Sequence, residues 1–422
     1  MAPVPSELSY VPASYEELSP FHEAPVLDQS TIDKYPVVHL DAIDLSQYVE
    51  GPEGLPARQK LAAQLEESIS TSGFFNLINT GYDADKIERL KTIAINLLNI
   101  PQEEKMQYLA GAITSDDEDR TKSLGGERGA GFKPRGYWSF AKGVRDAIEH
   151  YNFRNLLHDD IFLSPEAISK LPAIVRPYVT EIQAYYQHLH YDVLKKISAL
   201  SDIILELPEG TLYEMFEVKQ NDLQNSGGGF GRFMRYHKMD PEDEAKVQKN
   251  WLRGHSDSTT FTMITSQPIL SLQIRDYDTG EWKFVAHRPN SLVVNIGDAL
   301  EFLTGSYFKS SIHRVVAPPE EQKDYTRLVL IYFQQPKAGT IVDPETLNSP
   351  KLNRLGLTKP AEWEKIDFFT WDDSKGRLYG QKAVNDTDGD EPLSVLLYGR
   401  LHERWHQRDK QEEVGVIRDY QV

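Results

Sequence analysis

The chain has 422 residues, a formal net charge of −18 and no cysteine. An acidic surface of this kind repels phosphate backbones and anionic lipids, which argues against nucleic acids and membranes as partners. The lack of cysteine excludes disulfides, thiolate metal sites and a cysteine nucleophile, so any metal must be held by histidine and carboxylate side chains.

Targeting signals are not apparent in the sequence. The N-terminal stretch Met1-Ala2-Pro3-Val4-Pro5 lacks the basic start and apolar centre of a signal peptide. No apolar run approaches the roughly 18 residues that a membrane-spanning helix requires. We therefore expect a cytoplasmic protein, with a monomer as the favoured state.

The first part of the chain predicts helices and short strands behind an irregular start. In the first predicted helix, leucine and isoleucine recur every four residues, as expected for one buried face. The expected elements are an irregular extension at 1–34, an edge strand at 35–41, a helix at 58–72, a strand and turn at 73–81, a helix at 84–98, and a surface loop or lid in the glycine-rich stretch 116–135.

The middle of the chain predicts a long helix followed by a strand. Apolar residues recur at helical spacing from about residue 177 to 200, which indicates an amphipathic helix. After a glycine-rich loop, residues 232–236 alternate as a strand does. This period places Arg232, Met234 and Tyr236 on one face.

Three residues of the next segment are candidate metal ligands. His255 and Asp257 are two residues apart, so on an extended strand they point to the same side. His313 stands at the start of an apolar strand far along the chain, and a fold that brings this strand opposite would supply a third ligand. Two imidazoles and one carboxylate occupy one face of an octahedron and leave the other open, as non-haem Fe(II) oxygenases require.

Arg327 begins a further apolar strand that ends at Phe333. A buried arginine is costly unless an anion pairs with it. Beyond this strand, residues 337–422 predict an irregular extension. It is expected to contain a turn-bearing segment at 370–376, a solvated acidic turn at 385–390 and a closing helix over 393–405.

Several stretches around these residues match one known family. They are Gly73-Phe74-Phe75, residues 101–105, Leu272-Gln273-Ile274, Trp282, residues 291–298, residues 307–315 and Phe333-Gln334-Gln335-Pro336. On these stretches the chain resembles the Fe(II)/2-oxoglutarate-dependent dioxygenases of the isopenicillin N synthase-like family, over about residues 35–336. The long terminal additions resemble fungal members more than plant members.

The resemblance implies a mainly β fold with helical flanks around a double-stranded β-helix (jelly-roll) core. It divides the chain into an irregular N-terminal extension at 1–34, a helical and strand region at 35–220, the dioxygenase core at 221–336 and a C-terminal extension with a closing helix at 337–422. It implies Fe(II), 2-oxoglutarate and O2 as cofactor and cosubstrates. The implied activity hydroxylates, desaturates or cyclises a small organic molecule of secondary metabolism and releases succinate and CO2.

The resemblance also assigns roles to individual residues. It makes His255, Asp257 and His313 the iron ligands. It places Arg327 at the distal carboxylate of 2-oxoglutarate, with Tyr236 as a second contact. The candidates for the substrate pocket are Tyr137, Arg232, Met234 and Phe333.

The chain departs from the family pattern at Val329, because the family motif is Arg-x-Ser and this chain has Arg327-Leu328-Val329. The lost hydroxyl removes a hydrogen bond worth about 0.5–1.5 kcal/mol. The departure leaves open an Fe(II) oxidase of the same fold that does not use 2-oxoglutarate. A non-catalytic jelly-roll binding protein is a further alternative, although such a protein has no need of three iron ligands. A zinc hydrolase is another, although no residue resembles its general base.

Overall fold

Two facing β-sheets form the core of the computed structural model, which describes residues 14–110, 129–136, 143–276, 279–380, 393–404 and 416–417. The first sheet has the strand order β1 (Val37–Val38), β10 (Trp282–Val285), β9 (Leu272–Arg275), β12 (His313–Val316) and β7 (Asn250–His255). The second has the order β2 (Ala42–Asp44), β3 (Phe74–Ile78), β11 (Ser291–Ile296), β8 (Phe261–Thr265), β13 (Arg327–Gln335), β6 (Gly228–Tyr236), β5 (Ile148–Phe153) and β4 (Gly131–Lys133). These sheets form the expected jelly-roll core.

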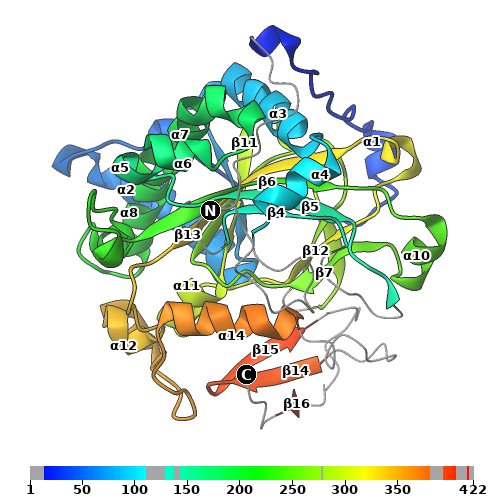
Figure 1. Ribbon diagram of the computed structural model, residues 1–422. Coiled ribbons are helices and arrows are strands. Elements are labelled where there is room, and N and C mark those ends of the chain that lie inside the picture. Colours follow the sequence, from blue (N-terminus) through cyan, green and yellow to red (C-terminus); the bar gives the residue numbers. More distant parts are fainter. Residues whose placement is uncertain are drawn as a thin grey trace.

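Helices flank this core on both sides (Figure 1). The larger group lies on one side of the eight-stranded sheet, and α14 lies on the opposite side of the core. The helices are α1 (Gln29–Ile32), α2 (Leu55–Thr71), α3 (Ala84–Leu98), α4 (Gln102–Lys105), α5 (Asp159–Phe162), α6 (Pro165–Ser169), α7 (Val179–His188), α8 (Lys195–Ile204), α9 (Thr211–Phe216), α10 (Pro241–Lys246), α11 (Asp298–Leu303), α12 (Pro344–Leu347), α13 (Pro350–Leu355) and α14 (Phe368–Gly380). The expected helices at 58–72 and 84–98 are confirmed as α2 and α3.

Strand β13 is buried on both faces, which explains why its sequence is almost continuously apolar. Leu328, Leu330 and Tyr332 pack into the large cluster formed with the helices. Val329 and Ile331 belong to a second cluster, which lies between the two sheets. Because side chains alternate along a strand, one segment supplies both the helix-facing core and the interior of the jelly-roll.

The predicted long helix is confirmed, and it is continuous from α7 to α8. A π-helical segment, η8 (Leu189–Leu194), joins the two. Tyr186 in α7 is fully buried against β6, and its ring occupies the space that a side chain at Gly231 would need. The helix therefore approaches the sheet closely at a glycine.

The C-terminal segment differs from its prediction at two places. The turn-bearing segment expected at 370–376 is wrong, because these residues lie within helix α14. The closing helix expected over 393–405 is also wrong, because β14 (Leu393–Leu397) and β15 (Arg400–Arg404) form an antiparallel hairpin, and β16 (Val416–Ile417) pairs with β14. Both turn residues of the hairpin, Tyr398 and Gly399, have positive φ, as a tight turn requires. The apolar run at 393–397 is too short to separate strand from helix by its period.

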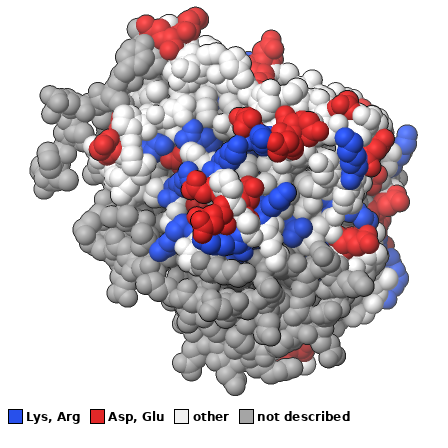
Figure 2. Space-filling model, turned by 90° about the vertical axis from the view of Figure 1, so that its right-hand side faces the viewer, with Lys and Arg blue, Asp and Glu red and all other residues white. Residues whose placement is uncertain are grey.

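On the face shown in Figure 2, lysine and arginine are interspersed with aspartate and glutamate among the described residues. Within these residues, no helix is long and apolar enough to cross a membrane. Tyr137, most of the predicted loop at 116–135 and the predicted acidic turn at 385–390 lie outside the described residues.

Candidate metal centre and active site

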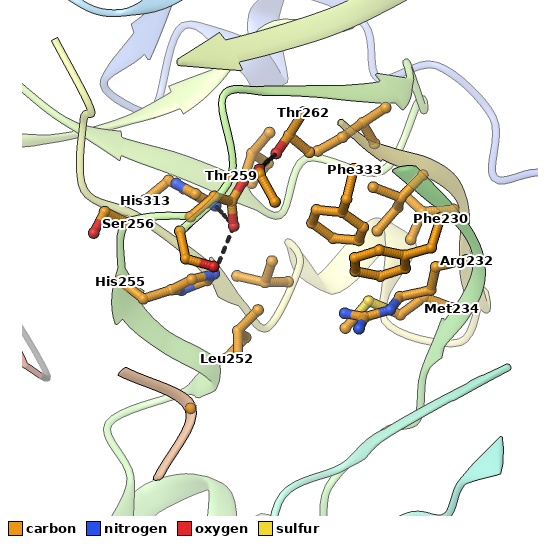
Figure 3. A pocket seen from close by; sticks show the side chains of 18 of the residues that line it. Phe230, Arg232, Met234, Leu252, His255, Ser256, Thr259, Thr262, His313 and Phe333 are labelled. Carbon is orange, nitrogen blue, oxygen red and sulfur yellow. Dashed lines mark hydrogen bonds and ion pairs between the residues drawn. The ribbon is translucent and has the colours of Figure 1, made fainter. Parts of the chain in front are cut away.

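Three potential metal ligands meet at one end of the space between the sheets (Figure 3). His255 ends β7 and His313 begins β12, and the antiparallel register pairs the two residues directly. Asp257 Oδ1 lies 3.8 Å from His255 Nε2 and 3.9 Å from His313 Nε2. Among the described residues, this is the one group of three whose ligand atoms lie within 4.8 Å of one another.

Backbone carbonyls orient both imidazoles. His255 Nδ1 donates to the carbonyl of Arg253 at 2.8 Å, and His313 Nδ1 donates to the carbonyl of Ser311 at 3.2 Å. A carbonyl oxygen can only accept, so each Nδ1 carries the proton. In a neutral imidazole with this tautomer, Nε2 has the free lone pair that a metal can use, and both Nε2 atoms lie within 3.9 Å of Asp257 Oδ1.

The two oxygens of the Asp257 carboxylate make different contacts. Its Oδ2 accepts hydrogen bonds from Thr262 Oγ1 at 2.7 Å and from Asn295 Nδ2 at 2.9 Å. Its Oδ1 is the oxygen that faces the two imidazoles. Hydrogen bonds of this kind fix the orientation of a ligand carboxylate before a metal arrives.

The protonation states at the centre suit a divalent metal. Burial and the neighbouring His313 lower the pKa of His255 to about 3. Burial opposes ionisation of Asp257, but the two histidines and the hydrogen bonds from Asn295 and Thr262 outweigh it and lower the pKa to about 2. At neutral pH, His255 is therefore a neutral imidazole and Asp257 an ionised carboxylate, the forms that bind metals.

A cavity of about 330 Å³ extends from this centre between the two sheets. One sheet contributes residues of β7, β9 and β12 to its wall, and the other contributes residues of β6, β8 and β13. Most of the wall is apolar, with the polar centre at one end. A chamber of this kind can admit an organic molecule beside the three potential ligands.

Arg327 reaches the cavity from the start of β13. It is 4% exposed, and its guanidinium carbon lies 4.4 Å from the ring centre of Tyr236, its register partner on β6. Within the described part of the chain, its Nε and Nη1 are buried without a hydrogen-bond acceptor. A buried guanidinium in this state fits a carboxylate, which would accept from two of its nitrogens.

Two family profiles match separate parts of the chain. The 2OG-Fe(II) oxygenase superfamily profile matches residues 231–336, and the profile described as non-haem dioxygenase in morphine synthesis N-terminal matches residues 40–166. Together they cover more than half of the chain. The chain belongs to the 2OG-Fe(II) oxygenase superfamily. It is a 2-oxoglutarate-dependent non-haem iron dioxygenase, as predicted, and uses Fe(II), 2-oxoglutarate and O2.

Relatives of this oxygenase occur in both plants and fungi. Protein DMR6-LIKE OXYGENASE 1 of Arabidopsis thaliana is 23% identical, over 85% of this chain and 89% of the relative. The 2-oxoglutarate-dependent dioxygenase citB of Monascus ruber is 25% identical, over 66% of this chain and 80% of the relative. The fold is also that of the dioxygenase for auxin oxidation in rice, with a TM-score of 0.57 and 17% identity over 86% of this chain and 99% of that chain.

The oxygenase brings most of the predicted pocket residues to the cavity wall. Arg232, Met234 and Phe333 all line it, and Figure 3 shows them at the end away from the two histidines. The ring of Phe333 stacks on Phe230, with 4.7 Å between ring centres. Tyr137, the fourth predicted residue, lies outside the described residues.

Sequence reasoning missed several lining residues of the oxygenase, among them Arg154 and three residues of the C-terminal extension. Arg154 follows β5, and its guanidinium carbon lies 3.9 Å from the ring centre of Phe230. Asp372, Lys375 and Gly376 come from α14, in the C-terminal extension. The local sequence of α14 predicted a turn. The docking of this helix against the core cannot be predicted from neighbouring residues in the sequence.

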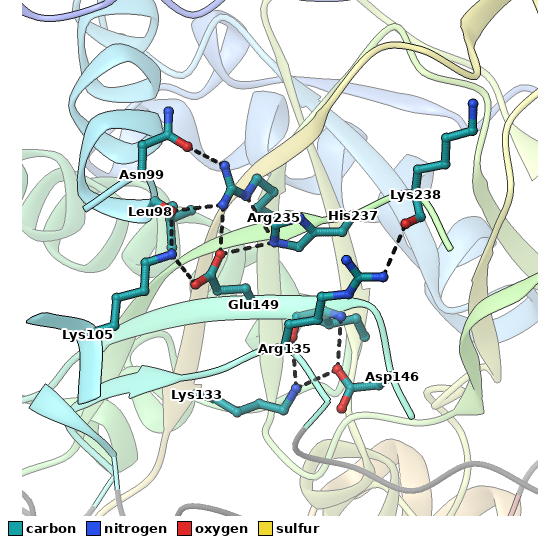
Figure 4. A network of polar contacts seen from close by, with 11 residues as sticks. Leu98, Asn99, Lys105, Lys133, Arg135, Asp146, Glu149, Arg235, His237 and Lys238 are labelled. Atoms are coloured by element: carbon teal, nitrogen blue, oxygen red, sulfur yellow. Dashed lines mark hydrogen bonds and ion pairs between the residues drawn. The ribbon is translucent and has the colours of Figure 1, made fainter. Parts of the chain in front are cut away.

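Buried charges anchor the opposite face of β6 (Figure 4). Arg235 alternates with the cavity-facing residues, and its Nη2 donates to Glu149 on β5 at 2.9 Å. Glu149 also contacts Lys105 of α4 and His237. Burial opposes ionisation of Glu149, but the hydrogen bond with His237 and the charges of Lys105 and Arg235 lower its pKa to about 2. The network restrains the strand that carries the cavity-facing residues of β6.

Proposed function

We propose that His255, Asp257 and His313 hold the Fe(II) of this oxygenase, and that Arg327 binds the distal carboxylate of 2-oxoglutarate. One observation carries this proposal. The convergent triad lines the same cavity as the buried Arg327, whose Nε and Nη1 lack an acceptor among the described residues. With Fe(II), 2-oxoglutarate and O2 bound, the site would oxidise a small organic molecule by hydroxylation, desaturation or ring closure and release succinate and CO2.

The residues of the chain have distinct parts in this reaction. The two backbone carbonyls and the Asp257 hydrogen bonds hold the ligands in place before the metal binds. The guanidinium of Arg327 would neutralise the far carboxylate, and the Tyr236 ring beneath it would hold that guanidinium flat. The apolar walls exclude water from the reacting end of the cavity.

The proposed substrate has an apolar body and an acidic or carbonyl group that meets Arg232. The Nε of Arg232 donates to the neutral Asn152 at 2.8 Å, and its guanidinium lies 4.8 Å from the Phe333 ring centre. Burial and the neighbouring Arg154 lower the pKa of Arg232 to about 10, so the side chain remains a cation at neutral pH. Met234 and Phe333 would contact the apolar body, with Tyr137 a further predicted contact.

Turnover of paired compounds tests this assignment. Aromatic and aliphatic acids are compared with hydrocarbons of the same skeleton, and succinate release is measured with Fe(II), O2 and 2-oxoglutarate. We expect the acids to stimulate succinate release. We expect Arg232→Met to raise KM for an acid by about 30-fold or more, because a buried charge loses its partner, with the KM for 2-oxoglutarate unchanged.

The control is Arg354→Met, which removes a surface arginine paired with Glu206 and should leave both KM values unchanged. If Arg232→Met left KM for a turned-over acid unchanged, the acidic group would not lie at Arg232. Succinate release that survived Asp257→Ala would count against the proposed iron ligands.

We also propose a family branch and a metabolic role for the oxygenase. We assign it to the isopenicillin N synthase-like branch and to fungal secondary metabolism. The matching motifs and the relative from Monascus ruber support this assignment. The cytoplasmic location, the monomeric state and the region boundaries at 34, 220 and 336 stay predictions.

A further inference from the structure

Helix α14 presses a buried lysine against the segment that carries the first two proposed iron ligands. Lys375 is 3% exposed. Its ammonium lies 2.5 Å from Asp298 Oδ2 and 2.9 Å from each of two further acceptors, the carbonyl oxygen and the hydroxyl of Ser256. An ammonium has three donors, and here each has an acceptor.

Ser256 stands between His255 and Asp257 in the chain. A hydrogen bond to its carbonyl oxygen restrains the backbone, and one to its hydroxyl restrains the side chain. Together they hold the two-residue span whose ends carry the imidazole and the carboxylate. Lys375 itself therefore touches the connection between two ligands.

Asp298 extends the same contact to the third ligand. Its Oδ1 accepts a hydrogen bond from Ser310 Oγ at 2.9 Å, three residues before His313. Its backbone N–H donates to the carbonyl of Asp257 at 2.7 Å. Its Oδ2 also accepts from Trp371 Nε1 of α14 at 3.2 Å. The Lys375–Asp298 pair thus joins both ligand-bearing segments to α14.

We propose that Lys375 is a positioning residue of the iron site, and that the C-terminal extension is therefore part of the active-site machinery. This inference rests on the proposed function, because it takes His255, Asp257 and His313 as the iron ligands. Metal affinity depends on groups that orient the ligands, and their loss typically weakens binding by about 10- to 100-fold. In this proposal Lys375 orients the ligands indirectly, through its hydrogen bonds to Ser256 and Asp298.

A purely structural anchor for α14 would not need this arrangement. Apolar residues of similar volume often replace a buried ion pair with no loss of stability. Around Lys375, α14 already has an apolar anchor in Phe368 and Trp371, which pack with Phe302. The Lys375 ammonium additionally fixes α14 relative to the proposed iron ligands, because its acceptors belong to Ser256 and Asp298.

Iron affinity of Lys375→Met tests the proposal. The methionine keeps most of the length of the aliphatic side chain and removes the ammonium. Equilibrium dialysis against Fe(II) under anaerobic conditions, without 2-oxoglutarate, measures affinity independently of activity, and thermal unfolding of the iron-free protein measures folding. We expect iron binding about 10- to 100-fold weaker. Lys365→Met, at an exposed position, is the control and should match the wild type.

A second variant covers the case in which Lys375→Met does not fold. The double variant Lys375→Met/Asp298→Asn leaves no lone charge buried, and the same loss of iron affinity is expected from it. Iron affinity equal to wild type in a folded variant with a lower Tm would overturn the proposal and leave Lys375 as an anchor. A wild-type protein that binds no Fe(II) would instead contradict the proposed function itself.

Discussion

Arg327 and Val329 lie two residues apart on β13 and face the same cavity. The family has a serine where this chain has Val329, so the proposed carboxylate site lacks one hydroxyl donor. The guanidinium and the Tyr236 ring beneath it remain. The charged contact is therefore expected to dominate binding, with the missing hydroxyl as a smaller loss.

Substitutions at these two positions should move 2-oxoglutarate affinity in opposite directions. Val329→Ser restores a donor and is expected to tighten binding by about two- to tenfold, from the 0.5–1.5 kcal/mol of one hydrogen bond. Arg327→Met removes the charge and should weaken binding by about 30-fold or more. Titration of 2-oxoglutarate into the Fe(II)-loaded variants measures both. Equal affinity in Arg327→Met and wild type would place the carboxylate elsewhere.

A second residue-scale prediction concerns His190, which is fully buried with its Nδ1 2.7 Å from the Tyr332 hydroxyl. Burial lowers its pKa to about 3, from an ordinary value of 6.5. Between these values the unfolded state binds a proton that the folded state does not. The free energy of unfolding therefore falls as the pH falls through this window.

Chemical denaturation at pH 7 and pH 5 checks this. His190→Gln lacks the titrating group, so its free energy of unfolding should fall by about 1–2 kcal/mol less than that of wild type between the two pH values. His22→Gln, at an exposed position, is the control. Identical pH dependence in His190→Gln and wild type would contradict the argument.

Sequence reasoning predicted the proximity of His255, Asp257 and His313 from their short spacing and from the strand that begins at His313. In the structure, β12 is the neighbour of β7 in the same sheet, and Asp257 follows the end of β7. Sequence reasoning did not reach Asp372 or Lys375. Their place in the cavity wall arises from docking of α14 against segments far away in the chain. The sequence of α14 alone therefore does not predict which distant residues the helix contacts.

At the scale of elements, the fit of the long helix against β6 depends on one glycine. A Cβ at Gly231 would lie 2.4 Å from two ring carbons of the buried Tyr186. Neither the strand nor the ring has space to move, because both lie within the close-packed core.

Gly231→Ala should therefore destabilise the protein by about 1–3 kcal/mol through overpacking. Gly228→Ala is a matched control on the same strand, where a Cβ meets nothing within 4 Å. Differential scanning fluorimetry should show a lower Tm for Gly231→Ala and little change for Gly228→Ala. A wild-type Tm for Gly231→Ala would mean that helix and sheet separate without cost.

Helices and strands were easier to predict from the sequence when their apolar repeat was long. Helices α2, α3 and α7–α8 were predicted correctly, because an apolar stripe repeats over several turns. The hairpin of β14 and β15 was mistaken for a helix. There, two buried positions, Val395 and Leu397, follow the strand period, and the turn between the strands is encoded only by Tyr398-Gly399.

At the scale of the whole molecule, the cavity wall runs from Arg154 to Gly376 and draws on both sheets and α14. The eight-stranded sheet likewise mixes strands that precede and follow residue 220. Sequence and resemblance could predict the core and its chemistry, since these depend on compact motifs. Which outer segments close the cavity depends on the assembled shape.

Anaerobic titration of 2-oxoglutarate into the Fe(II)-loaded protein, followed by its visible charge-transfer band, tests the proposed site most directly. We expect a saturable band in the wild type, none in His255→Ala, and a titration displaced to higher concentration in Arg327→Met. Iron binding without a band would favour an oxidase that does not use 2-oxoglutarate. Absence of iron binding in the wild type would contradict the assignment of His255, Asp257 and His313.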